Sequence, residues 1–238
     1  MSTALDMSAT APVVFDLGKA DLRTLNTTLQ ALADGTNETF WSILNPRGAH
    51  ALAVGITTPI TVTVDGHAGY YCAGMNDGAK ITVTGNVGTG VAENMMSGLV
   101  HVLGDASQAA GATAHGGLLI IEGNAAARCG ISMKGVDIVV KGSVGHMSAF
   151  MAQSGNLVIL GDAGEALGDS LYEAKIFVRG TVASLGADCE EKQITPEQKT
   201  ELAELLRRAG ANADVNSFRL YGSARTLYHF HVDNAGSY

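Results

Sequence analysis

The chain has 238 residues, of which 30 are glycine, 4 are proline and 3 are cysteine, and its formal net charge is -8. Glycine well above its usual share of about 7%, with so little proline, excludes collagen-like and Pro-rich disordered chains. No apolar run is long enough to cross a bilayer, no signal-peptide pattern opens the chain, and no Lys/Arg cluster indicates a nucleic-acid binder. We therefore expect a cytoplasmic protein, and the charged fraction of only 16% predicts that partners cover much of its surface.

Residues 1–44 do not follow the pattern of the rest of the chain and form a predicted helical extension. Four leucines recur there at helical spacing: Leu22, Leu25, Leu29 and Leu32. Gly35 follows them and is the predicted end of this helix.

A repeat fills residues 45–190. Seven glycines stand at intervals of 19 residues without an insertion: Gly66, Gly85, Gly104, Gly123, Gly142, Gly161 and Gly180. The positions four and two residues before each glycine are always apolar and mostly β-branched, which predicts a short strand with one buried face. The position between them changes from Thr63 and His101 in early repeats to Val139 and Phe177 in later ones, so we expect the other face to be covered only in part.

These features predict an all-β fold, a parallel β-helix of seven coils. Small residues three and seven positions after each repeat glycine predict tight corners, where a larger side chain would clash. A repeat of 19 residues is too short for a βαβ unit, which needs roughly 30, and it lacks the spaced leucines of a leucine-rich repeat. Equivalent strands are therefore expected to stack as parallel ladders about 4.8 Å apart.

Residues 191–238 are predicted to form a capping helix and an aromatic tail. Thr195, Pro196 and Gln198 read as an N-cap, a first helical residue and the second half of a capping box. The apolar stripe of this helix consists of Leu202, Leu205 and Leu206, and Gly210 is its predicted end. The tail from Phe218 onward concentrates aromatic residues, which we expect to dock on the column or on a partner. These aromatic residues include Tyr221, Tyr228, Phe230 and Tyr238.

The sequence contains no motif for catalysis or for cofactor binding. No Cys/His group has ligand spacing, and Gly88-Thr89-Gly90 is not followed by the rest of a dinucleotide or phosphate-binding motif. Cys72 and Cys129 hold equivalent positions three coils apart, so we expect two buried thiols that are too distant for a disulfide. His229 and His231 lack a third ligand. We predict no catalytic, cofactor-binding or metal-binding residue in this chain.

Methionines gather at one corner of the predicted coils. Six of the eight lie between residues 75 and 151, and five of these fall nine to eleven residues after a repeat glycine. They either fill gaps in the core or form an adaptable contact surface, and the low surface charge favours the surface. Polar residues near the same corner either line a passage or form a solvated rim. The predicted partner or tunnel edge consists of Met75, Asn76, Glu93, Asn94, Met95, Met96, Met133, Lys134 and Met151.

Two carboxylates allow a different function, a self-sufficient β-helix enzyme that acts on polysaccharide. Asp105 and Asp162 each follow a repeat glycine, but they lie three coils apart. That separation is about 14 Å, wider than the roughly 6.5–9.5 Å between the carboxylates of inverting glycosidases. The spacing therefore disfavours this function.

Several segments of the chain carry a family resemblance. They are Asn45-Pro46-Arg47-Gly48, Gly69-Tyr70-Tyr71-Cys72-Ala73-Gly74-Met75-Asn76, Gly90-Val91-Ala92-Glu93-Asn94-Met95-Met96-Ser97-Gly98, Arg128-Cys129-Gly130-Ile131-Ser132-Met133-Lys134-Gly135 and Asp233-Asn234-Ala235-Gly236-Ser237-Tyr238. From about Asn45 to Tyr238 the chain resembles the GXGXG-repeat domain that closes the large subunit of glutamate synthase. It is most similar to free-standing versions of that domain, such as one subunit of N-methylglutamate synthase. A more distant likeness is to the corresponding subunit of formylmethanofuran dehydrogenase and formyltransferase/hydrolase complexes.

The resemblance implies a right-handed parallel β-helix without chemistry of its own. In that family an amidotransferase domain releases ammonia, an FMN barrel with an iron–sulfur cluster makes the amino acid, and the β-helix holds the two in register. The resemblance thus implies a scaffold and channelling subunit, inactive alone, in a hetero-oligomer with amidotransferase-like and FMN/iron–sulfur subunits. The implied reaction converts methylamine and glutamate to N-methylglutamate and ammonia. A split glutamate synthase and the formylmethanofuran-type complex are the alternatives, and neither nucleic acid nor membrane is an expected partner.

Overall fold

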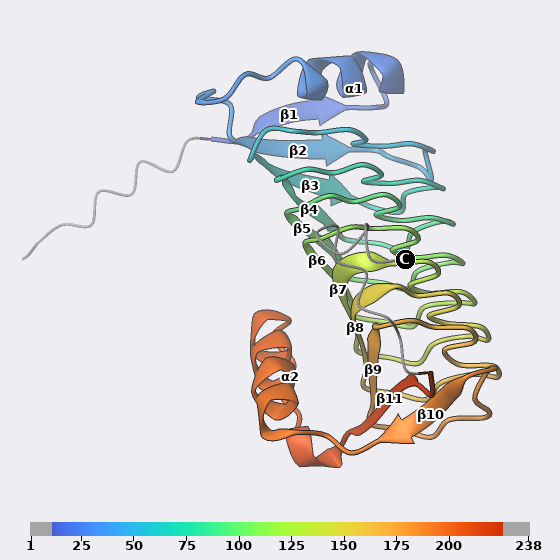
Figure 1. Cartoon of the computed structure of the whole chain (residues 1–238). Helices are drawn as coiled ribbons and strands as arrows, with labels where there is room; N and C mark the ends of the chain where they lie inside the picture. Colours follow the sequence, from blue (N-terminus) through green and yellow to red (C-terminus); the bar gives the residue numbers. More distant parts are fainter. Residues whose placement is uncertain (1–10, 226–238) are drawn as a thin grey trace, which may run out of the picture.

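The computed structural model describes residues 11–225. Its strands form one sheet in the order β1-β2-β3-β4-β5-β6-β7-β8-β9-β11-β10 (Figure 1). The strands are β1 Val13–Asp16, β2 Phe40–Leu44, β3 Thr61–Asp65, β4 Lys80–Val83, β5 Leu99–Val102, β6 Leu118–Ile121, β7 Lys134–Val140, β8 Ser154–Ile159, β9 Lys175–Val178, β10 Cys189–Lys192 and β11 Arg219–Ser223. The helices are α1 Leu22–Gln30 and α2 Pro196–Arg208, and a 3-10 turn, η1, spans Val215–Ser217.

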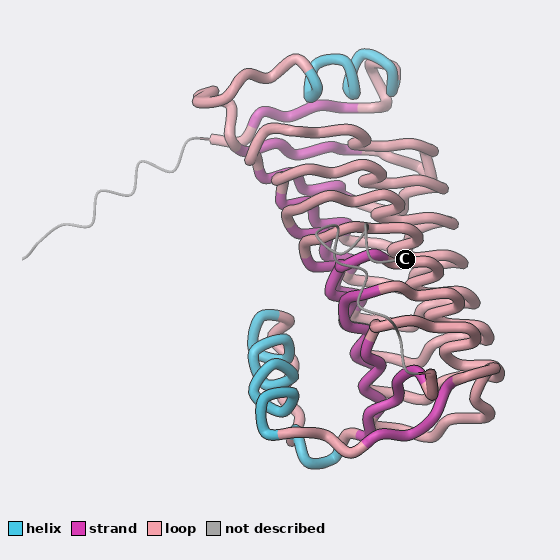
Figure 2. The backbone as a smooth tube through the Cα atoms, in the orientation of Figure 1, coloured by secondary structure: helices cyan, strands magenta, loops and turns pink. Residues whose placement is uncertain are grey.

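Each 19-residue repeat makes one turn of a parallel β-solenoid, so the predicted fold is confirmed (Figure 2). Strands β1 to β9 pair in parallel with their neighbours, and equivalent positions of successive repeats lie opposite each other, as Val62, Ile81 and Val100 do. A second ladder of isolated bridges joins the residues two positions after each repeat glycine, beginning with Ala68 and Val87. Because no repeat carries an insertion, the period of the sequence becomes the register of the sheet.

The inward-facing strand positions of the column are apolar along its length. The two strand positions predicted to face inward are fully buried at both ends of the solenoid, at Val62 and Val64 and again at Ile176 and Val178. Parallel pairing stacks these side chains into continuous rows. Each fully buried side chain of this size contributes about 1.5–3 kcal/mol of hydrophobic stabilisation.

Close stacking of consecutive coils explains the repeat glycines. A Cβ on Gly142 would lie 2.6 Å from the carbonyl oxygen of Gly123, and a Cβ on Gly180 would lie 2.2 Å from that of Gly161. Real Cβ atoms essentially never approach closer than 3.0 Å. Among the seven repeat glycines only Gly66 has a positive φ, 133°. The spacing of the glycines therefore reflects close contact between coils. In six of the seven cases the glycine does not adopt a left-handed conformation.

The corners opposite the strands use positive φ at residues other than glycine. In the first full coil Tyr71, Ala73 and Met75 have φ values of 59°, 56° and 54°. Their N–H groups point alternately to the following and the preceding coil: that of Tyr71 donates to the carbonyl of Thr89, and that of Ala73 to the carbonyl of Leu52. A left-handed residue costs roughly 1–2 kcal/mol when it carries a Cβ. Hydrogen bonds to both neighbouring coils hold the corner in this conformation.

The N-terminal segment is more than the helical extension predicted for residues 1–44. Strand β1 pairs in parallel with β2, and β2 pairs in parallel with β3, so the sheet begins well before residue 45. The predicted helix exists as α1, and its buried Leu25 and Leu29 close the interior of the first coil. It ends at Gln30 and not at Gly35, because the chain leaves the helix after Ala31 and Leu32 packs against the column.

The C-terminal helix starts as predicted but does not cap the end of the column. The capping box of Thr195 and Gln198 is present, and Gly210 follows the helix with a φ of 61°. Helix α2 lies along the outer face of strands β6 to β9 (Figure 1). Its buried residues pack on the apolar outer positions of those strands, and this cover explains why the position is polar in early repeats and apolar in later ones. The packed residues are Leu202, Leu205 and Leu206 of α2 and Ile120, Val139, Val158 and Phe177 of the sheet.

Two antiparallel strands close the far end of the sheet. Strand β11 pairs with β9, and β10 pairs with β11 as the edge strand. The exposed Glu190 and Glu191 on β10 discourage pairing with another chain. Phe218 and Tyr221 are buried and dock on the column, in line with the expectation for the tail. The remaining tail residues singled out above lie outside the described residues: Tyr228, His229, Phe230, His231 and Tyr238.

We predict that Gly142→Ala lowers the free energy of unfolding by about 2–3 kcal/mol, because the new methyl group forces two coils apart. Gly222→Ala is the matched control, since its Cβ would meet nothing nearer than the Lys192 side chain at 3.5 Å. Urea denaturation followed by circular dichroism measures both variants. Equal stability of the two variants would contradict close stacking as the role of the repeat glycine.

Candidate partner-binding edge

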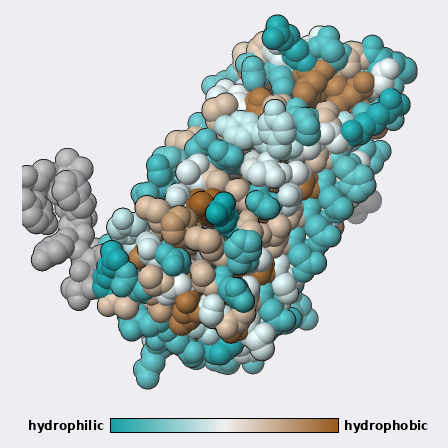
Figure 3. All heavy atoms as spheres, turned by 90° about the vertical axis from the view of Figure 1, so that its right-hand side faces the viewer, coloured by the Kyte–Doolittle hydropathy of each residue, from teal (hydrophilic) through white to brown (hydrophobic). Residues whose placement is uncertain are grey.

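The corners opposite the sheet carry the residues predicted to meet a partner. Figure 3 shows this face, on which hydrophobic residues stand in small groups among hydrophilic ones. The thioether side chains of Met75, Met96 and Met151 are exposed by 47%, 48% and 41%. Methionine is among the residue types most often buried, and these three side chains are available for contact.

Three residues of the predicted edge lie in the interior instead. Asn76, Met95 and Met133 are fully buried, because the position ten residues after each repeat glycine points into the core. Met95 and Met96 are neighbours in the chain with opposite exposure. The prediction treated positions nine to eleven as one surface, and it is corrected for these three side chains.

The polar members of the predicted edge differ in exposure. Lys134 is exposed, and Glu93 and Asn94 are half-buried. The Asn94 side-chain oxygen accepts a hydrogen bond of 2.6 Å from the hydroxyl of Thr113 on the next coil. No ion pair within residues 11–225 involves Glu93 or Lys134.

Two exposed tyrosines extend this surface and were not predicted. Tyr70 is exposed by 53% and stacks on the ring of His50 with 4.2 Å between centroids, and Tyr172 is exposed by 43%. Tyr172 holds the same repeat position as Met96 and Lys134, eleven residues after a repeat glycine, so its position could have indicated it. No repeating pattern marks Tyr70, since the equivalent positions in other coils carry unrelated residues such as Thr89 and Gln108. We call the five exposed residues the loop edge: Tyr70, Met75, Met96, Met151 and Tyr172.

The backbone places two of these methionines in an unfavourable conformation. Met75 and Met151 have φ values of 54° and 52° at equivalent positions, where other coils carry Asn94, Thr113 or Ser132. Asn is well tolerated in the left-handed region, whereas a long apolar residue gains nothing there locally. An exposed apolar side chain on strained backbone points to a role outside the folding of the column.

The cysteines are not reactive groups. Cys72 and Cys129 are buried, and burial raises the pKa of each thiol to about 12. Cys189 is half-buried, and burial followed by the charges of Glu190 and Asp169 raises its pKa to about 11. All three thiols are protonated at neutral pH, whereas the thiolate is the nucleophilic form.

Asp105 and Asp162 have structural roles. The carboxylate of Asp105 accepts a 2.7 Å hydrogen bond from the backbone N–H of Asn124, and that of Asp162 accepts one of 2.7 Å from the N–H of Thr181. The backbone and hydroxyl bonds from Thr181 lower the pKa of Asp162. Neither carboxylate is set up to cleave a glycosidic bond.

These two bonds belong to a polar ladder that joins seven coils. In the first six of these coils, the residue after the repeat glycine accepts the backbone N–H of its equivalent in the next coil, at 2.7–2.9 Å. The ladder consists of His67, Asn86, Asp105, Asn124, Ser143, Asp162 and Thr181. The sequence carried a signal for it, because every repeat has a side chain with an acceptor atom directly after the glycine.

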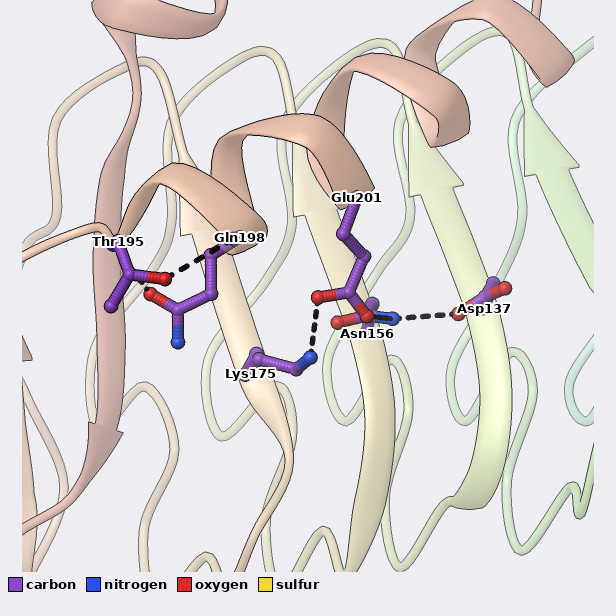
Figure 4. Close-up of polar contacts among 6 residues, drawn as sticks. All are labelled: Asp137, Asn156, Lys175, Thr195, Gln198 and Glu201. Carbon is purple, nitrogen blue, oxygen red and sulfur yellow. Dashed lines mark hydrogen bonds and ion pairs between the residues drawn. The ribbon is translucent and has the colours of Figure 1, made fainter.

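A second polar group fixes α2 along the column (Figure 4). The Glu201 carboxylate accepts hydrogen bonds from the Lys175 ammonium at 2.5 Å and the Asn156 amide at 3.0 Å. The same amide donates to Asp137 at 2.8 Å. Asp137, Asn156 and Lys175 are equivalent residues of three consecutive coils, so Glu201 sets the position of the helix along the column.

The described part of the chain shows neither a metal centre nor a membrane span. Within residues 11–225 no group of three His, Cys, Asp or Glu side chains is placed to hold a metal ion. None of the helices in that range is long and apolar enough to cross a membrane.

We predict that Ser143→Ala lowers stability by about 1 kcal/mol, because the N–H of Asp162 loses its acceptor at 2.9 Å. Ser143→Asn is the control, since an amide oxygen fills the same place in the ladder at Asn124. Chemical denaturation measures both. If the Asn variant were as unstable as the Ala variant, the ladder would not be the cause.

Glu201→Ala should loosen α2 and cost about 1 kcal/mol, because Lys175 and Asn156 lose a shared acceptor that is partly exposed to water. Glu204→Ala on the same helix removes only an exposed pair with Arg207 and serves as control. Hydrogen exchange of the α2 amides, compared between the two variants, measures this loosening, and we expect lower protection in Glu201→Ala. Equal protection in both would show that Glu201 does not hold the helix.

Comparison with known proteins identifies a relative along nearly the whole chain. The chain is 67% identical over 227 residues to Protein GlxC of Rhizobium meliloti (strain 1021), which covers 94% of this chain and 99% of the relative. No family model matches the chain, and no solved structure matches it. On the strength of this match the chain belongs to the GlxC family.

Proposed function

We propose that this chain is the scaffold and channelling subunit of a glutamate-synthase-like complex, specifically of N-methylglutamate synthase. The observation that carries the proposal is the solenoid itself, whose uninterrupted repeat agrees with the resemblance to the GXGXG-repeat domain. The reaction would convert methylamine and glutamate to N-methylglutamate and ammonia, and the complex would work in the cytoplasm.

The side chains of the column support a role without bond chemistry. Asp105 and Asp162 are used by the ladder, and the Cys72 and Cys129 thiols are buried and protonated. We therefore assign the chemistry to two partner subunits, one amidotransferase-like and one carrying FMN and an iron–sulfur cluster. This chain would hold none of these cofactors.

A stiff column is suited to keeping two active sites in register. Seven coils at about 4.8 Å give a length of roughly 34 Å, and every coil is bonded to its neighbours on the sheet and at the corners. A fixed distance between active sites shortens the path of a small amine and limits its loss to solvent. The loop edge would supply the partner contact, since flexible thioethers adapt to a facing surface.

The proposed function is tested by reconstitution. We expect no turnover from the chain alone, and N-methylglutamate formation from methylamine and glutamate once both partner subunits are added. Turnover by the isolated chain would overturn the scaffold role. Activity of the complex with 2-oxoglutarate and a reductant, but not with methylamine, would instead identify a split glutamate synthase.

We predict that Met96→Glu weakens partner binding at least about tenfold, because the complex would bury a carboxylate without a counter-charge. Ala203→Glu on the exposed side of α2 adds the same charge away from the loop edge. Both variants should keep the wild-type circular dichroism spectrum. Equal binding of both variants, measured by surface plasmon resonance against the partner subunits, would show that Met96 lies outside the interface.

A further inference from the structure

Two hydrogen bonds between coils at the N-terminal end of the column have a histidine ring as the acceptor, one at the start of the polar ladder and one outside it. The Nδ1 atom of His67 accepts the backbone N–H of Asn86 at 2.8 Å. The Nδ1 atom of His50 accepts the N–H of Tyr70 at 3.1 Å, one coil earlier. Further along, the acceptors are amide, hydroxyl and carboxylate oxygens, beginning with Asn86.

We propose that these two histidines form a pH-sensitive joint: mild acid breaks both hydrogen bonds and loosens the first coils, while the ladder from Asn86 to Thr181 stays closed. A backbone N–H needs an unprotonated ring nitrogen opposite it, which assigns the proton of each neutral ring to Nε2. A protonated imidazole carries hydrogen on both nitrogens and accepts nothing. Amide and hydroxyl oxygens accept at any pH, and carboxylates remain ionised in mild acid.

Both rings are pressed against the backbone of the next coil. A Cβ on Gly69 would lie 2.0 Å from Nδ1 of His50, and a Cβ on Gly85 would lie 2.6 Å from Nδ1 of His67. A protonated ring in that place would bring its N–H against the backbone N–H, so the ring has to swing out into water. Both histidines are exposed, and this movement is open to them.

The surroundings of His50 and His67 do not stabilise the protonated rings. The charged residues beside them are Arg47 and Asp65, and no carboxylate of residues 11–225 lies within 4 Å of either ring. The residue that donates to His50 is Tyr70, and the phenol of Tyr71 follows it in the chain. Helix α1 faces this coil with the uncharged Asn26 and Gln30, which bond to the carbonyls of Ala51 and Val54.

His101 shows the opposite arrangement, because its ring faces a carboxylate and not a backbone N–H. Its Nε2 lies 2.7 Å from the Glu122 carboxylate, which also pairs with Lys141 at 2.8 Å, so protonation of His101 strengthens that contact. At His50 and His67 protonation has the opposite effect, because a protonated ring cannot accept the backbone N–H. Acid therefore loosens the N-terminal coils without loosening the middle of the column.

The joint lies beneath part of the loop edge. Tyr70 donates its N–H to His50 and stacks on the same ring, so release of that ring also frees the most exposed residue of the loop edge. The proposal concerns the fold of this chain, and it stands whether or not the chain belongs to an N-methylglutamate synthase complex.

Amide hydrogen exchange resolved by NMR tests the joint on the full chain. Between pH 7.5 and pH 5.5, after correction for the intrinsic exchange rate, the protection of the Asn86 and Tyr70 amides should fall about fivefold, the value of one hydrogen bond. The amides of Asn124 and Ser143, whose acceptors are a carboxylate and an amide, should keep their protection. Unchanged protection of Asn86 and Tyr70 would overturn the proposal.

His67→Asn and His50→Asn are the matched variants, because the Oδ1 atom of Asn stands where His carries Nδ1. In His67→Asn the Asn86 amide should be protected equally at both pH values, while Tyr70 keeps its pH response, and His50→Asn should give the reverse. If Asn86 still lost protection in acid in the His67→Asn variant, another titrating group would be responsible and the proposal would be wrong. His101→Gln should leave both responses unchanged.

Discussion

The contact on which this structure depends is the approach of one coil to the next at the repeat glycine. With no Cβ at Gly142 or Gly180, the backbone of the preceding coil can come within a distance that any other residue would block. This approach sets the separation of the coils, and the separation makes every other inter-coil bond possible: the parallel ladder of the sheet, the bridges beyond each glycine and the polar ladder. A constant interval of 19 residues repeats that contact without drift. The result is a column whose stability is the sum of nearest-neighbour terms.

Much of this could be predicted because a parallel register turns a period in the sequence directly into a row in space. The strands, their buried positions and the start of α2 all followed from local signals such as Val62, Ile81 and the capping box at Thr195. The corners could not be predicted in the same way. The small residue seven positions after each glycine did mark one left-handed position, as at Ala73, but the left-handed residues on either side of it, such as Tyr71 and Met75, carry no composition signal. That is why Met95 and Met96 were expected on one surface although one is buried and the other exposed.

The position of α2 was missed for a different reason. A capping helix is expected at the end of a solenoid, where open strand edges need cover, but β10 and β11 take that place. The clue was the change at the outer strand position from Thr63 to Val139 and Phe177, which indicated a covered face in the later coils alone. Only the tertiary structure shows that Glu201 bonds to residues of consecutive coils and thereby selects which strands the helix covers. Polar contacts of this kind join residues far apart in sequence, so no periodic pattern in the sequence indicates them.

The placement of α2 also divides the outer face of the sheet into a covered part and an uncovered part. Over β6 to β9 the outer face is apolar and already covered by the helix. Over β3 to β5 the central outer positions are Thr63, Thr82 and His101, polar residues that are stable in contact with water. A partner therefore gains little hydrophobic stabilisation from either part of the sheet. The loop edge differs, because it exposes methionine and tyrosine side chains that no element of the described chain covers, and aromatic and methionine residues are the ones enriched at protein interfaces. The same stacking that uses the polar groups of the column in bonds between coils thus leaves apolar side chains exposed at its corners.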